Sequence, residues 1–336
     1  MPKKPAGKSL WKKPKESMTP ATMGTMMRQL AQMLEAADAS EVITKDDLNA
    51  LVASLGGPSP TDRLSDKEAD AREEAKQIAF DAMEAETEAQ ARKLAKRALR
   101  LDPDCVDALV VMTNLQARNP HEMIAGLQGA VAAGERSLGD KFIRQNKGHF
   151  WLLLDTRPYM RALQALAEAF RGAGINLDAI QGFEKMLELN PNDNQGVRDP
   201  LLGLYLETGD LKGAGRLLKK YKEDVSANFE WARVLERFLA GDLDGAGRAL
   251  TAARKANRHL ELFLTQKESL PKELPEMYSP GSEEEAVLVL SYLSGALSKQ
   301  KEACFWLFDQ LAADGVRPTP SASALKKMKV VGKTVQ

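Results

Sequence analysis

Aromatic and guanidinium side chains gather in one short stretch near the middle of the sequence. It contains His149, Trp151, Arg157, Tyr159 and Arg161. Such groups often anchor partners at protein interfaces, because arginine binds carboxylates and phosphates through two parallel hydrogen bonds. Arg157 and Arg161 are four residues apart, so a helix would present both on one face. The stretch predicts either a polar, partly basic binding surface or a structural network of ion pairs.

A second polar cluster runs from Asn190 to Arg198. Asn and Asp side chains commonly end one helix and cap the next, which gives this run a purely structural interpretation. If both clusters lie on one concave face, they form a groove suited to a peptide carboxylate. The residues that we predict to contact a partner are His149, Trp151, Arg157, Tyr159, Arg161, Asn194 and Arg198.

The sequence does not contain the common patterns of catalytic or metal sites. Nucleophilic catalysis needs a serine or cysteine beside an oriented histidine, and the few, scattered His and Cys residues leave few such combinations. Cys105 and Cys304 lie far apart within apolar helical patterns, which is typical of small buried side chains. We therefore expect no catalytic residue, no metal and no cofactor. The remaining enzymatic alternative is a subunit that uses His149 with Asp155.

Composition favours an all-helical protein without a strong overall charge. The 47 basic and 47 acidic side chains cancel, so no net field attracts nucleic acid or an anionic membrane. Straight-chain helix formers abound, whereas aromatic residues make up 6% of the chain. No apolar stretch resembles the core of a signal peptide or reaches the roughly 18 residues of a membrane helix. We expect a cytoplasmic protein without membrane contact.

Helix pairs recur at a spacing of about 34 residues, which is the period of tetratricopeptide repeats. The turn Gly-Asp-Leu occurs at 209–211 and again at 241–243. Small residues such as Ala95 let paired helices approach closely, and Pro103 ends the first pair. Residues 65–315 are thus predicted to form an all-α solenoid of about five helix pairs. Two C-terminal helices are expected to cap its open end, where an apolar face would otherwise meet water.

The segments outside this region differ in composition. Residues 1–20 are rich in Lys and Pro, and residues 317–336 are also basic, so we expect both to be loose tails. Residues 21–57 predict a short helical segment, because Met and Leu recur there at three- and four-residue steps. The second functional alternative is association with nucleic acid through the lysine-rich ends.

Several strings of the repeat region carry a resemblance to a known family, namely 133–139, 148–151, 155–161, 190–196 and 278–285. In them the chain resembles a bacterial family of tetratricopeptide-repeat proteins related to the suppressor-of-tumorigenicity-seven proteins of animals. The resemblance implies an all-helical interaction scaffold without an assigned catalytic role.

The chain also departs from that family at two places. At 257–261 the proline-containing turn of the family is missing, so a longer helix is expected there. Asp199-Pro200 is expected to interrupt the first helix of the fourth pair, because proline deletes a backbone donor.

Overall fold

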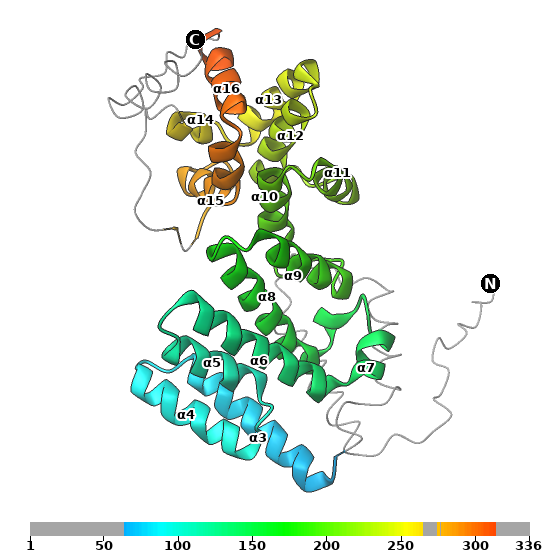
Figure 1. Cartoon of the computed structure of the whole chain (residues 1–336), viewed down its shortest axis with the longest axis vertical. Helices are drawn as coiled ribbons and strands as arrows, with labels where there is room; N and C mark the ends of the chain where they lie inside the picture. The colour runs from blue at the N-terminus through cyan, green and yellow to red at the C-terminus, as the bar shows by residue number, and fades with distance from the viewer. Residues whose placement is uncertain (1–63, 265–273, 276, 314–336) are drawn as a thin grey trace, which may run out of the picture.

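The computed structural model describes residues 64–264, 274–275 and 277–313. Within these residues the regular structure consists of fourteen α-helices and two short 3-10 helices, without a strand. The helices are stacked along the long axis of the molecule, from α3 and α4 at one end to α13 and α16 at the other (Figure 1). The prediction of an all-α protein is confirmed, and the predicted segments 1–20, 21–57 and 317–336 lie outside the described residues.

Most of the helices pack as successive pairs along the chain. The second helix of each pair also contacts the first helix of the next pair. Between the second and third pairs lie α7 (Asp140–Gln145), η1 (Phe150–Leu152) and η2 (Leu154–Thr156). The paired helices are α3 (Asp66–Met83) with α4 (Glu88–Leu101), α5 (Val106–Gln116) with α6 (Pro120–Leu138), α8 (Arg157–Gly172) with α9 (Asn176–Leu189), α10 (Arg198–Thr208) with α11 (Leu211–Lys220), and α12 (Ala227–Leu239) with α13 (Leu243–Ala256).

The repeated Gly-Asp-Leu tripeptide makes the same turn in the fourth and fifth pairs. Gly209 and Gly241 adopt φ angles of 76° and 80°, a region in which a Cβ atom would be strained. Asp210 and Asp242 then cap α11 and α13, because each carboxylate accepts a hydrogen bond at 2.8 Å from the N–H three residues ahead. The two turns are thus built by the same local rules.

The start of α10 differs from the expectation drawn from Asp199 and Pro200. The helix begins at Arg198, so both residues lie in its first turn. A proline there removes no intrahelical hydrogen bond, because the first N–H groups of a helix have no partner within it. The expectation that Asp199-Pro200 interrupts a helix is therefore wrong.

The chain turns at Asn257, where a longer helix was expected. The Asn257 side chain accepts a hydrogen bond at 2.9 Å from the N–H of His259 and donates one at 2.8 Å to the carbonyl oxygen of Ser282. These contacts end α13 and position the short helix α14 (His259–Leu264). The expectation is wrong because the hydrogen bonds of the buried Asn257 side chain hold a turn at this place.

The C-terminal helices are α15 (Glu283–Lys299) and α16 (Lys301–Ala313). α15 packs along α10 and α12, and α16 contacts α12 and α15. At Gly203 of α10, an added Cβ atom would overlap the carbonyl oxygen of Tyr292 in α15. Both helices were expected to cap the open end of the array. For α15 this expectation is wrong, because α15 lies beside α10 on the side away from α11 (Figure 1). None of the described helices is long and apolar enough to cross a membrane.

Candidate functional site

Trp151 and Arg157 form a stacked pair at the start of α8. The Arg157 guanidinium lies 5.0 Å from the centroid of the Trp151 ring, and its Nε donates a hydrogen bond at 3.1 Å to the Trp151 carbonyl oxygen. Such a cation–π contact holds both groups in place. Both side chains are half-buried, and the neighbouring His149 is exposed. This part of the predicted cluster is therefore accessible to a partner.

Tyr159 and Arg161 are instead engaged in contacts within the fold. The buried Tyr159 donates a hydrogen bond at 3.0 Å to Glu135, and burial raises the pKa of its hydroxyl to about 12. Arg161 binds the buried carboxylate of Asp107 through two hydrogen bonds, of 3.0 and 2.7 Å. The contacts of these two residues agree with the structural network of ion pairs, one of the two alternatives that the sequence allows. Their role in partner binding stays a prediction.

Removal of the Arg161 side chain tests this structural contact. We expect Arg161→Ala to lower the free energy of unfolding by about 1–2 kcal/mol, because the buried Asp107 carboxylate loses a bidentate partner. Solvent screening keeps the effect moderate, since the arginine side chain is 40% exposed. Urea unfolding measures the change, and Arg100→Ala at an exposed position of α4 is the matched control. Equal losses in both variants would rule out the structural role.

Arg198 lies at the centre of the second predicted cluster. Its guanidinium lies 2.9 Å from the Asp224 carboxylate and 3.8 Å from that of Asp193, and it stacks on the ring of Tyr221. Asp193 also accepts hydrogen bonds from two backbone N–H groups at the start of α10, which is the turn function expected for this run. Asn194 is exposed. The two predicted clusters thus combine accessible side chains with side chains that stabilise the fold.

His149 and Asp155 do not line a common cavity. Asp155 forms an ion pair with Lys76 of α3. Both residues line a cavity of 20 Å³, and Cys105 lines the same cavity. A cavity of this size holds about one water molecule. Burial raises the pKa of the Cys105 thiol to about 11, which keeps this thiol protonated at neutral pH. His149 lies outside this cavity, so the geometry gives the enzymatic alternative no support here.

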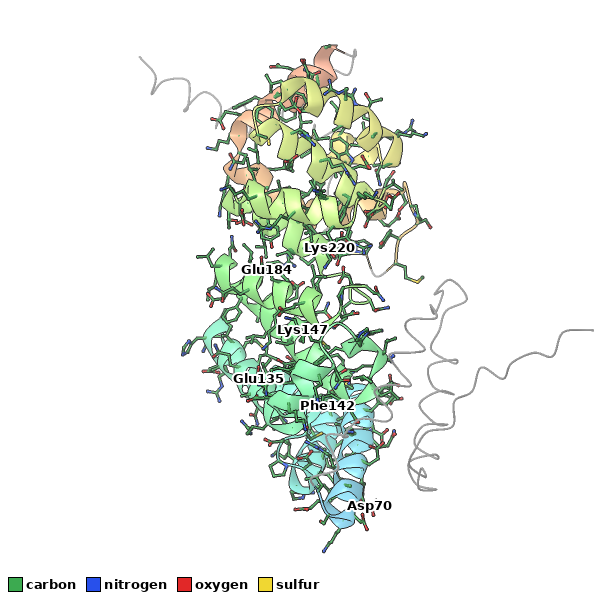
Figure 2. The ribbon with its side chains drawn as sticks, turned by 90° about the vertical axis from the view of Figure 1, so that its right-hand side faces the viewer. Asp70, Glu135, Phe142, Lys147, Glu184 and Lys220 are labelled. Atoms are coloured by element: carbon green, nitrogen blue, oxygen red, sulfur yellow. The ribbon has the colours of Figure 1, made fainter. Side chains whose placement is uncertain are left out.

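An open groove between α9 and α11 was not predicted from the sequence. Its volume is 630 Å³, and α10 forms its floor together with parts of both walls. The floor is apolar and is formed by Leu187, Leu201 and Leu217 of three different helices, which are at most 6% exposed. Charged side chains line the two walls, and Glu184 and Lys220 mark the face on which the groove opens (Figure 2).

None of the predicted contact residues lines this groove. The sequence interpretation missed it because α9 and α11 belong to different helix pairs, so their distance depends on how the pairs are stacked. A usable signal was present in α11, where Lys and Arg recur at three- and four-residue steps without an acidic residue. Among the residues that the structure describes, no group of three or more His, Cys, Asp or Glu is arranged to hold a metal ion.

The resemblance to tetratricopeptide-repeat proteins depends on the sequence strings alone. In the structure these strings lie on α6, on η1 and η2 with the start of α8, between α9 and α10, and around the start of α15. Family models and curated proteins give no match to the chain.

Proposed function

We propose that the protein is a non-catalytic helical-repeat scaffold that binds a protein or peptide partner in the groove between α9 and α11. The observation that carries this proposal is the groove itself, which combines an apolar floor with charged walls and has a volume of 630 Å³. Pockets that bind ligands have volumes of roughly 300–1,000 Å³. An apolar groove of this kind suits the apolar face of an amphipathic helix.

The packing of the helices supports a solenoid of the tetratricopeptide type as the scaffold. Successive pairs contact each other in order along the chain, and two pairs share the same Gly-Asp-Leu turn. Helical arrays of this kind present extended surfaces and commonly bind partners. The resemblance to a bacterial tetratricopeptide-repeat family favours the same function, and we place the protein in the cytoplasm.

The accessible residues of the predicted clusters remain candidates for additional partner contacts. They are His149, Trp151, Arg157, Arg161, Asn194 and Arg198, which are exposed or half-buried. They lie at η1, on α8 and after the end of α9, and Glu188 near that end lines the groove.

Site-specific photo-crosslinking in the host cell tests the proposed function. A photoreactive amino acid replaces Gln181, an exposed residue on the α9 wall of the groove, in the full-length chain. The matched control carries the same group at Arg248, which is exposed on α13. We expect a discrete protein adduct from position 181 alone. No adduct at position 181, or the same adducts at both positions, would exclude the groove as the binding surface.

A further inference from the structure

We propose that the occupant of the groove is an acidic amphipathic helix of a partner protein. Its apolar stripe lies on the leucine floor, and its carboxylates pair with the cations of α11. This inference rests on the proposed function and adds the chemistry of the partner. It is based on the basic side chains of α11 and on the contacts of the acidic side chains on the opposite wall, which is formed by α9.

α11 presents four basic side chains on one exposed face. They are Lys212, Arg216, Lys219 and Lys220, and the helix contains no acidic residue. None of the four forms a salt bridge with a residue that the structure describes. Like charges at i and i+4 repel each other, which destabilises an isolated helix. Lys220 lies 5.0 Å from the centroid of the Tyr221 ring, but none of the four cations has a carboxylate partner among the described residues. A concentration of such cations beside an apolar groove therefore indicates an anionic partner.

Several arginines elsewhere in the structure are paired within the fold. Arg72, Arg136, Arg161 and Arg254 each lie within 4.0 Å of a carboxylate. Arg216 and Lys220 line the groove and have no carboxylate within 4.0 Å among the described residues, so both are available to a partner there.

The acidic residues of the opposite wall already have partners. Glu184 accepts a hydrogen bond at 2.5 Å from the Tyr205 hydroxyl, and burial together with Glu184 raises the pKa of that hydroxyl. Glu188 forms an ion pair with Lys147, which lies on the same face of the molecule (Figure 2). Of these two carboxylates, Glu188 is paired with a cation and Glu184 with a neutral hydroxyl. The α9 wall also contains Lys185, whereas the α11 wall contains Arg216 and Lys220 and no acidic residue, so the larger excess of charge lies on the α11 wall.

The dimensions of α11 specify the pattern of the partner. Lys212, Arg216 and Lys220 follow each other at four-residue steps, which corresponds to about 6 Å per step along a helix. A partner helix alongside α11 would match them with carboxylates at i, i+4 and i+8. Leucine-type residues at i+3 and i+7 spacing would then face the floor formed by Leu187, Leu201 and Leu217.

Binding of designed peptides to the full-length chain tests this inference. Two helical peptides share the same leucine stripe, and one carries Glu at i, i+4 and i+8 where the other carries Gln. We expect the Glu peptide to bind about tenfold more tightly at low salt, measured by fluorescence anisotropy. The preference should be lost in Arg216→Gln/Lys220→Gln, and it should persist in Lys93→Gln/Lys96→Gln, which removes the same charge from an exposed face of α4. Circular dichroism shows that the variants keep their helices.

Two results would overturn the inference. One is equal binding of the two peptides, or a preference that survives the α11 substitutions. The other is tighter binding of a single-stranded oligonucleotide than of the Glu peptide with the same dependence on α11, which would assign the cations to nucleic acid. If crosslinking at position 181 still captures a partner in either case, the scaffold function stands and only the proposed partner chemistry is wrong. A failure of both experiments would remove the groove as a binding site.

Discussion

Asp199→Asn is expected to raise the free energy of unfolding by about 2 kcal/mol at about pH 8. Burial raises the pKa of the Asp199 carboxyl to about 7. Its hydrogen-bond partner is the Asn228 side-chain amide at 3.0 Å, whereas the adjacent Arg198 is directed towards Asp224. A carboxylate in this place is poorly compensated, and an asparagine keeps an oxygen acceptor without the charge.

The direction of the pH dependence follows from the two pKa values. The pKa of an unfolded aspartate is about 3.9, so between about pH 4 and pH 7 the folded protein binds more protons than the unfolded chain. The raised pKa of Asp199 therefore stabilises the folded protein. This contribution to the free energy of unfolding is fully present below about pH 4 and is lost as the pH rises through 7. The full shift corresponds to roughly 4 kcal/mol, and we expect about half because water and nearby groups relax around the charge.

Urea unfolding at about pH 5 and about pH 8 measures this effect through the difference between wild type and variant. Carboxylates with lowered pKa values, such as Glu135 and Glu207, make the free energy of unfolding rise with pH. Their effect is the same in wild type and variant, so it cancels in the difference between the two. Asp178→Asn, at an exposed site in the first turn of α9, is the matched control and should leave the wild-type pH dependence unchanged. A gain for Asp199→Asn that is no larger at high pH than at low pH would contradict this assignment.

Gly203→Ala is expected to lower the free energy of unfolding by about 2–3 kcal/mol. The added Cβ atom would overlap the Tyr292 carbonyl oxygen and lie 3.0 Å from its carbon. Because the obstacle is backbone, it cannot rotate away, and α15 has to move from α10. This cost exceeds the gain of about 1 kcal/mol that alanine normally brings inside a helix.

Gly215→Ala is the matched control for this substitution. Gly215 also lies inside a helix, and its added Cβ atom would have its nearest neighbour, the Glu236 carboxylate, at 3.9 Å. We expect this variant to be up to about 1 kcal/mol more stable than wild type. Thermal or urea unfolding of both variants therefore gives opposite signs. A loss of equal size in both, or a gain in both, would contradict the close packing of α15 on α10.

Local sequence rules predict the helix pairs well, because caps and turns depend on neighbouring residues. The Gly-Asp-Leu tripeptides illustrate this, since Asp210 and Asp242 satisfy N–H groups only three residues away. The position of α15 follows no such rule. Gly203 and Tyr292 are far apart in the sequence, and their approach depends on the shape of the whole stack.

The candidate site was predicted only in part for the same reason. Residue types at 148–161 suit an interface, but the partner of Arg161 is Asp107, which lies 54 residues earlier and cannot be identified from spacing. The groove between α9 and α11 combines side chains of three helices, so no single helix reveals it. The basic face of α11 was visible as a pattern, and only the structure places that face beside an apolar floor.

Amide hydrogen exchange of the full-length chain, with and without the Glu-bearing helical peptide, tests most directly whether the groove is the binding surface. We expect the peptide to slow exchange in α9 and α11, which form the walls of the groove, and to leave α3 and α4 at the far end unchanged. Slower exchange confined to helices α3 to α8, with α9 and α11 unaffected, would contradict the proposed site.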